Sequence, residues 1–356
     1  MERNALITLT AACFLSGALH AQMQRIVLQG SGEPQVFTDI AAAVSAAQPN
    51  DKLYFSGGAF IATAGFTIDM PLHFIGAGVH PDSTNVTSTT EIATTTGSIT
   101  ITTDASGSTF TGIAFNAAAG IQYGSSDTDD NPTDILFQRC RLMCPVTFTQ
   151  DGFSTSSTTF DECIVNESFN GGVGGPANTT SATFTRCVFG NAPGTGTIGQ
   201  VGNLFVSHCV FLTEEICRNS EGAVIENSIC TLTSSAPVYQ SNNVIMNNCL
   251  FSAAVYTGNS SGEVITDCQL NVPTASIFVN ETDNAFQFTD DLHLAPGSGG
   301  VGGAEDGTDI GIYGSSSPAK AGNVPYNPHY RQANIATATD ANGDLPVTIQ
   351  VATQPN

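Results

Sequence analysis

The side chains that could do chemistry in this chain are mainly carboxylates, and the densest group of them lies in one short polar segment. Asp129 and Asp130 are adjacent, and two carboxylates held at a suitable separation can act as acid and base in glycoside hydrolysis. We therefore name both as catalytic candidates. The segment also spaces oxygen ligands as in half of a Ca²⁺-binding loop, and its calcium candidates are Asp127, Asp129, Asn131 and Asp134. Solvated turns are the alternative for this segment.

The ten cysteines are a second chemically versatile group, and six of them fall on one position of a repeat: Cys140, Cys163, Cys187, Cys209, Cys249 and Cys268. Equivalent positions on stacked strands have parallel Cβ atoms about 4.8 Å apart. That separation exceeds the roughly 3.5–4.5 Å between the Cβ atoms of a disulfide. We predict a structural ladder of buried free thiols that pack as small hydrophobic side chains. Cys144 and Cys217 lie off the ladder, and whether they form a disulfide stays open.

A repeat of eight residues positions these cysteines. Its copies are Ser108–Phe115, Ile135–Leu142, Thr158–Val165, Ala182–Phe189, Leu204–Phe211, Ala223–Cys230, Val244–Phe251 and Glu263–Leu270. From Ile113 onward, successive sixth positions are 27, 23, 24, 22, 19, 21 and 19 residues apart. A variable period near 22 residues is typical of a solenoid whose coils have fixed strands and one loop of variable length.

The apolar pattern of the repeat also predicts a corner. Positions 3, 6 and 8 are apolar, and only positions 6 and 8 obey the two-residue period of a strand. The chain must therefore turn between positions 3 and 6. Position 5 holds Asn227, Asn248 and Asp267 on three coils, and these residue types favour turns. Arg139, Glu162 and Arg186 hold it on three other coils, which predicts an alternating charged stack, worth under about 1 kcal/mol per contact if it is exposed.

These repeats resemble the pectate lyase-like right-handed parallel β-helix superfamily. The segment 37–47 is typical of a short amphipathic helix that begins at Thr38 or Asp39 and covers the end of such a solenoid. The segments 292–298, 306–314 and 325–329 resemble the tails of secreted β-helix proteins of Bacteroidota. The resemblance implies an all-β fold, a right-handed parallel β-helix (solenoid) with a short N-terminal capping helix.

The sequence divides into four parts. Residues 1–21 carry Arg3 and then an apolar run before a small residue, which predicts a secretory signal peptide and a secreted, extracellular or cell-surface location. The segment is too short to span a membrane, and no other segment could cross one. An N-terminal strand and capping helix follow at 22–52, then coils at 53–290 and an irregular C-terminal cap region at 291–356.

The net charge and the absence of known catalytic motifs limit the functions that we expect for this chain. The chain has 31 Asp and Glu against 9 Lys and Arg, a net charge of −22, which disfavours nucleic acid and polyanionic sugars as partners. The resemblance implies Gly-His-Gly and Arg-x-Lys motifs for hydrolases and a basic residue beside Ca²⁺ for lyases. Neither motif occurs, although Asp290 and Asp291 form a further carboxylate pair. We predict a non-catalytic protein that binds glycan, a polysaccharide or another surface component. The alternative is a divergent polysaccharide lyase or glycoside hydrolase, and Ca²⁺ is the one cofactor considered.

Overall fold

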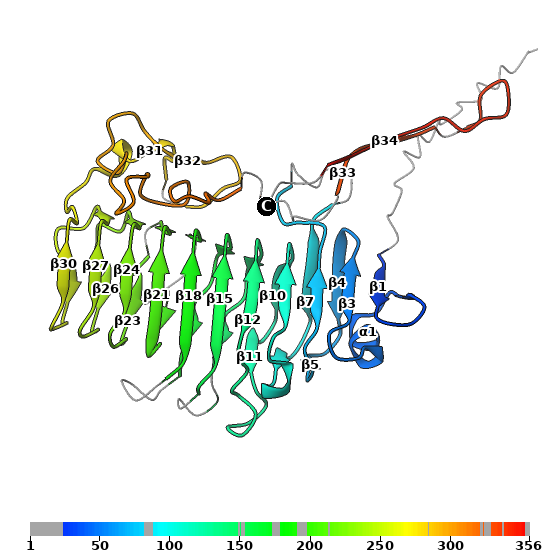
Figure 1. Cartoon of the computed structure of the whole chain (residues 1–356), viewed down its shortest axis with the longest axis horizontal. Helices are drawn as coiled ribbons and strands as arrows, with labels where there is room; N and C mark the ends of the chain where they lie inside the picture. The colour runs from blue at the N-terminus through cyan, green and yellow to red at the C-terminus, as the bar shows by residue number, and fades with distance from the viewer. Residues whose placement is uncertain are drawn as a thin grey trace, which may run out of the picture.

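The repeat folds as strand, corner and strand, and its copies stack into a parallel β-helix (Figure 1). The computed structural model describes residues 24–81, 88–148, 150, 154–172, 179–190, 198–212, 214–283, 285–320, 323, 329–336 and 338–352. The predicted signal peptide, residues 1–21, lies outside the described residues. The predicted all-β solenoid is confirmed, and no described helix is long and apolar enough to span a membrane.

Three sheets form the walls of the solenoid. Sheet A contains, in spatial order, β2 (Gln35–Phe37), β1 (Ile26–Gln29), β3 (Lys52–Phe55), β6 (His73–Ile75), β9 (Thr109–Thr111), β12 (Ile135–Gln138), β15 (Ser157–Asp161), β18 (Ser181–Thr185), β21 (Asn203–Ser207), β24 (Val224–Glu226), β27 (Ile245–Asn247) and β30 (Val264–Thr266). Strand β1 pairs antiparallel with β2 and β3, and every later pair in sheet A is parallel.

Sheet B contains β4 (Gly58–Ala62), β7 (Thr90–Thr94), β10 (Ala114–Ala117), β13 (Arg141–Leu142), β16 (Ile164–Val165), β19 (Val188–Phe189), β22 (Val210–Phe211), β25 (Ile229–Cys230) and β28 (Leu250–Phe251). Sheet C contains β5 (Phe66–Ile68), β8 (Ile99–Ile101), β11 (Ile121–Tyr123), β14 (Val146–Thr147), β17 (Phe169–Asn170), β20 (Ile198–Gly199), β23 (Cys217–Arg218), β26 (Val238–Tyr239) and β29 (Thr257–Gly258).

A column of stacked side chains fills the interior, as the repeat predicts for position 3. The rings of Phe110, Phe137, Phe160 and Phe184 stack with successive centroid distances of 4.7, 5.1 and 4.7 Å. Stacks of this kind are worth about 0.5–1.5 kcal/mol each beyond the burial of area. The column continues in later coils as Val206, Ile225 and Met246, all fully buried.

One residue per coil makes the corner between sheets A and B. Position 5 takes a left-handed backbone conformation in seven copies: Arg139, Glu162, Arg186, His208, Asn227, Asn248 and Asp267, with φ between 49° and 53°. The predicted corner is therefore confirmed. Left-handed φ is costly for residues with a Cβ, and Asn and Asp adopt it most readily. Arg and Glu adopt it here because the stacked neighbours impose the same turn on every coil.

The cysteine ladder satisfies the backbone at that corner. The N–H of Cys187 donates to Sγ of Cys209 in the next coil at 3.4 Å, and that Sγ reaches the carbonyl of Phe184 at 3.5 Å. Ser228 replaces cysteine in the following coil, and its Oγ accepts from the N–H of Cys209 at 3.0 Å. Ile113 holds position 6 in the first copy, and from Cys140 onward the position holds a small side chain that can accept and donate a hydrogen bond. The sequence predicted its size and burial but not this polar role.

Helix α1 (Ile40–Ala46) closes the N-terminal end. The Asp39 side chain accepts from the N–H of Ala42 at 2.7 Å, which selects Asp39 over Thr38 as the N-cap. Ile40, Val44 and Ala47 are buried as the amphipathic pattern predicts. The described chain also contains two short 3₁₀ helices, η2 (Thr103–Ala105) and η4 (Thr274–Ser276).

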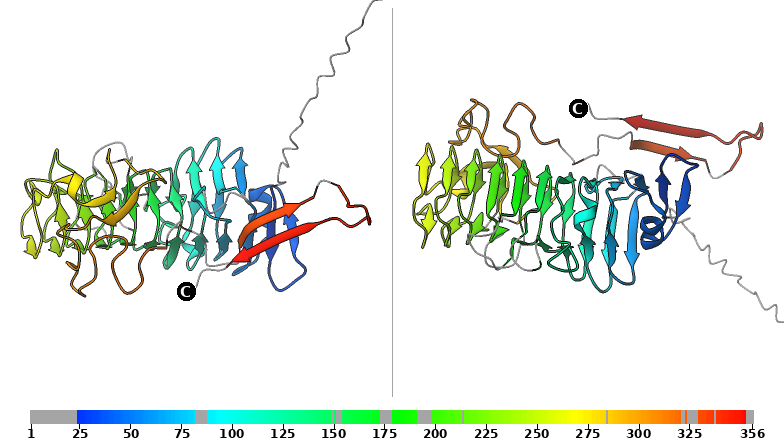
Figure 2. Two further views of the ribbon diagram at one scale, coloured as in Figure 1. Left: turned by 90° about the horizontal axis from the view of Figure 1, so that it is seen from above. Right: turned by 60° about the horizontal axis from the view of Figure 1, so that its bottom comes forward.

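The coils end earlier than position 290. The last stacked strand is β30, and strands β31 (Phe278–Asn280) and β32 (Asp291–Leu294) form a separate antiparallel pair. The chain then runs back along the solenoid (Figure 2) and ends in the hairpin of β33 (His329–Ile335) and β34 (Val347–Ala352). The apolar residues between 272 and 290 pack on the outside of sheet B rather than inside a further coil, which is why the boundary differs from the prediction.

The corner predicts a difference between two substitutions of Cys209. Cys209→Ala removes the acceptor for the buried N–H of Cys187 and should cost about 1–3 kcal/mol of stability. Cys209→Ser should cost less, because Ser228 already makes the equivalent bonds one coil later. Thermal unfolding of both variants checks this, and equal stability of the two would contradict the polar role of the ladder.

Candidate functional site

The outer face of sheet B is covered by the chain itself. Its outward side chains at position 7 include Val188, Val210, Ile229 and Leu250, all buried. The covering segment, which we call the strap, consists of the described residues of 272–323. Its apolar side chains against sheet B are Ile277, Phe278, Leu292, Ile310 and Ile312. The apolar character of position 7 was visible in the sequence, and it is the signal that could have predicted a cover over this face.

The position-5 residues form what we call the corner column, and two of its charged members, Arg139 and Glu162, are buried beneath the strap. The Arg139 and Glu162 side chains are 0% and 1% exposed. The guanidinium binds both carboxylate oxygens, with Nε–Oε2 at 3.1 Å and Nη2–Oε1 at 3.3 Å. Arg186 pairs with Asp161 instead of Glu162. The predicted alternating stack is therefore present between Arg139 and Glu162 but does not continue to Arg186. The energy expected for an exposed contact does not apply to this buried pair.

Polar groups of the strap bind this column directly. The backbone N–H of Lys320 donates to Glu162 Oε2 at 2.8 Å, and Asn323 Nδ2 donates to the carbonyl of Glu162 at 2.7 Å. Arg186 Nη1 donates to the carbonyl of Ser317 at 2.8 Å. These bonds fix the strap to the two coils on which the charged corner residues lie.

Further along, the strap binds the amide corner residues in the same way. The N–H of Gly311 donates to the carbonyl of Asn227 at 2.9 Å, and the N–H of Glu305 donates to its Oδ1 at 3.2 Å. Asn248 Nδ2 donates to the carbonyl of Gly303 at 3.0 Å. The strap therefore follows the corner column from the late coils towards the early ones.

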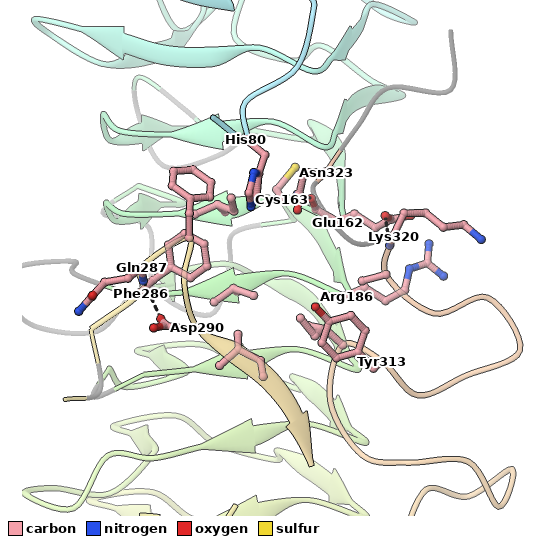
Figure 3. Close-up of a pocket in the computed structure, with 16 residues that line it drawn as sticks. His80, Glu162, Cys163, Arg186, Phe286, Gln287, Asp290, Tyr313, Lys320 and Asn323 are labelled. Atoms are coloured by element: carbon pink, nitrogen blue, oxygen red, sulfur yellow. Dashed lines mark hydrogen bonds between the residues drawn. The ribbon is translucent and has the colours of Figure 1, made fainter. Parts of the chain in front are cut away.

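A cavity of about 70 Å³ lies where the strap crosses the charged part of the column (Figure 3). Glu162, Arg186, Lys320 and Tyr313 line it on one side, and Phe286 and Asp290 line it on the other. Sites for small organic ligands usually enclose about 300–1,000 Å³. This space can hold water but not a sugar residue, and we assign it to the seam between strap and solenoid.

The carboxylate pair Asp290 and Asp291 does not act as a unit. Asp290 lines the cavity, and burial raises the pKa of its carboxyl. Its Oδ2 accepts from the N–H of Gln287 at 2.6 Å. Asp291 is partly exposed and instead contacts His293 Nδ1 at 2.6 Å. Each of these two side chains therefore binds its own near neighbour within the strap.

The catalytic candidates Asp129 and Asp130 lie in a loop between sheets C and A, where each fixes the loop. Asp129 Oδ1 accepts from the N–H groups of Ser125 and Ser126 at 2.9 and 2.8 Å. Desolvation raises its pKa, but the bonds from Ser126 and Ser125 outweigh this and leave it lowered. Asp130 is 1% exposed, and its Oδ2 accepts from the N–H of Gln150 at 2.7 Å. Their catalytic role stays a prediction.

The other calcium candidates differ in exposure and in hydrogen bonding. Asp127 and Asp134 are exposed, while Asn131 Oδ1 accepts from the N–H of Thr155 at 2.7 Å. Within the described ranges, no group of three or more His, Cys, Asp or Glu side chains is placed to hold a metal ion. Ca²⁺ binding by this loop also stays a prediction.

All nine described cysteines are free thiols, including Cys144 and Cys217. Five of the six ladder cysteines are buried, and Cys268 on the last coil is partly exposed. Burial raises the pKa of Cys144 to about 11 and that of Cys217 to about 12. Neither thiol is a reactive nucleophile near neutral pH, since the thiolate is the reactive form.

A pair of glutamates beside sheet C was missed in the sequence. Glu214 and Glu215, each 8% exposed, precede β23. Glu215 binds Arg218 through two bonds of 2.9 and 2.8 Å, and the guanidinium lies 4.3 Å from the centre of the Tyr239 ring. Burial, and then the charge of Glu215, raise the pKa of Glu214 to about 7. The only signal for this pair is that it is the one Glu-Glu dipeptide in the chain.

The outer face of sheet A, which we call the open face, carries the larger hollow. A groove of about 310 Å³ crosses β12, β15 and β18, lined by Asp134, Ile135, Leu136, Ser157, Thr158, Thr159, Ser181 and Thr183. Leu136, Thr159 and Thr183 are register partners on successive strands, so they repeat about every 4.8 Å. In the described part of the chain, the hydroxyls of Thr159, Ser181 and Thr183 make no hydrogen bond and are available to a ligand.

Comparisons of the chain with protein-family models, with curated proteins and with solved structures found no match.

The buried ion pair predicts a large loss of stability when its carboxylate is neutralised. Glu162→Gln leaves the Arg139 guanidinium buried without its charged partner, and we expect a loss of about 3–5 kcal/mol. Glu33→Gln, at an exposed position, is the matched control and should change little. Denaturant unfolding measures both, and a Glu162→Gln protein as stable as the control would contradict the role assigned to this pair.

The raised pKa of Glu214 predicts a pH dependence with a definite sign. The folded protein holds this proton up to about pH 7, whereas an unperturbed Glu releases it near 4.5. The stability from this group is therefore full below pH 4.5 and is lost as the pH rises through 7. The melting temperature of the parent protein relative to that of Glu214→Gln should fall over this window. A difference that is constant with pH would contradict the assignment.

Proposed function

We propose that the protein is a secreted, non-catalytic β-helix that binds an extended neutral glycan along the open face of sheet A. The observation that carries the proposal is the groove over three coils, in which hydroxyls without a hydrogen-bond partner in the described chain lie side by side on the neighbouring strands β15 and β18. A repeating surface matches a repeating polymer. Sheet B offers no such surface because the strap covers the outward side chains of its later strands.

Charge favours a neutral polymer as the ligand. The net charge of −22 repels uronate-rich and sulfated polysaccharides. Among the described residues that line the groove, Asp134 is the one ionisable residue, and the others have hydroxyl or aliphatic side chains. Hydrogen bonds from these hydroxyls would fix the orientation of the sugar, and Leu136 would provide apolar contact.

The proposal also includes a secreted location and a place in a known superfamily. The apolar segment in residues 1–21 supports export through a secretory signal peptide. The strand-corner-strand repeat supports a divergent place in the pectate lyase-like superfamily, within the type of secreted β-helix protein found in Bacteroidota.

Glycan binding is tested by removing hydroxyls without changing shape. Thr159→Val with Thr183→Val keeps both β-branched side chains, and loss of two hydrogen bonds at about 0.5–1.5 kcal/mol each should weaken binding about tenfold. Thr147→Val, on an outward position of sheet C, is the control and should bind normally. The measurement is calorimetric titration and co-sedimentation with xylan, mannan, starch and β-glucan. No binding to any of them, or equal binding by both variants, would contradict the proposal.

The Glu214–Glu215 pair favours a second candidate, a divergent glycoside hydrolase or polysaccharide lyase. A glutamate with a pKa of about 7 beside one paired with Arg218 is the asymmetry that acid–base catalysis uses. Release of reducing ends or of unsaturated uronates, lost in Glu214→Gln but retained in Thr159→Val with Thr183→Val, would favour this candidate.

A further inference from the structure

The two ends of the solenoid differ in how their cores are closed. At the N-terminal end, α1 and the β1–β2 pair cover the first coil. At the C-terminal end, β30 pairs only with β27 among the described strands. The interior residues Met246, Cys249 and Phe251 are fully buried in the penultimate layer. Their equivalents in the last layer, Ile265, Cys268 and Leu270, are only partly buried.

This uncapped end also exposes apolar side chains outside the core. Val264 on β30 is 55% exposed, and Val255 on the preceding loop is 52% exposed. We call this surface, with the free edge of β30, the open end. Terminal repeats of solenoids normally have a polar cap, and a free strand edge is a template for pairing with another chain.

The C-terminal hairpin also has free strand edges and an exposed apolar face, like the open end. Its strands β33 and β34 pair with each other and with no other described strand. Val347, Ile349 and Val351 alternate along β34 and therefore share one face. They are 49%, 49% and 56% exposed. A two-stranded hairpin with an uncovered apolar face is marginally stable by itself.

The hairpin and the open end lie at opposite ends of the molecule. The strap carries the chain back along the corner column from Asn248 to Glu162, and the hairpin projects beyond the end where β1 lies (Figures 1 and 2). One molecule therefore cannot close its own open end with its own hairpin, but a second copy can be placed to do so.

We propose that copies of this protein associate head to tail, with the hairpin of one copy covering the open end of the next. The free edge of the hairpin adds to the edge of β30, and its apolar face covers the last layer of the core. Charge favours this contact, since β34 contains no charged residue while most of the surface of this acidic chain repels a second copy. The contact joins two different surfaces, so it does not close into a dimer and gives open chains.

Two variants test this arrangement. Ile349→Asp disables the hairpin face and Val264→Asp disables the open end, each by placing a carboxylate at an exposed position. The assay is light scattering coupled to size-exclusion chromatography over a range of concentrations. The parent protein should show a mass that rises with concentration, and each variant alone should be monomeric.

Mixing the two variants separates head-to-tail contact from other arrangements. An Ile349→Asp copy keeps its open end and a Val264→Asp copy keeps its hairpin, so the mixture should form a species of twice the monomer mass and no larger one. A monomeric parent protein would overturn the proposal, and so would a mixture that stays monomeric. Self-association of Val264→Asp alone would overturn it in favour of hairpin-to-hairpin pairing.

Discussion

One left-handed residue in each coil is the constraint on which the rest of the structure depends. It turns the chain from sheet A into sheet B at the same position of every repeat, so inward residues of successive coils fall on one another. After the turn, the backbone N–H groups of Cys187, Cys209 and Cys249 donate to a side chain. In each case the acceptor is the position-6 cysteine or serine of the next coil. The left-handed turn, the position-6 ladder and the column of stacked phenylalanine rings therefore repeat together along the axis of the solenoid.

The same corner decides which faces of the solenoid meet water. The corner column presents carbonyls, amides and charges on the outside of the turn, and the strap binds to them while its apolar residues cover sheet B. The Arg139–Glu162 pair is buried by this cover. Among the described residues, no such cover lies over the groove of sheet A, which leaves a repeating surface on a rigid support. A site built on strands of a solenoid holds its geometry better than a site built on loops.

Local patterns predicted the solenoid well because each coil contacts mainly its neighbours. The spacing of Cys140, Cys163 and Cys187 and the slip between positions 3 and 6 were enough to predict strands, corner and interior ladders. The strap depends on contacts between segments more than a hundred residues apart, such as Glu162 with Lys320. The local repeat in the sequence does not reveal such contacts. For the same reason the sequence did not show that Arg139 and Glu162 are buried. The groove was missed because Thr159 and Thr183 are ordinary outward strand residues until the register places them side by side.

Hydrogen exchange read by mass spectrometry, with and without a saturating neutral glycan, tests the central claim most directly. The account predicts slower exchange in β15 and β18, which form the floor of the groove, and unchanged exchange in the strap and around Glu214. Protection confined to the strap or to the segment 214–218, with none in β15 and β18, would contradict it.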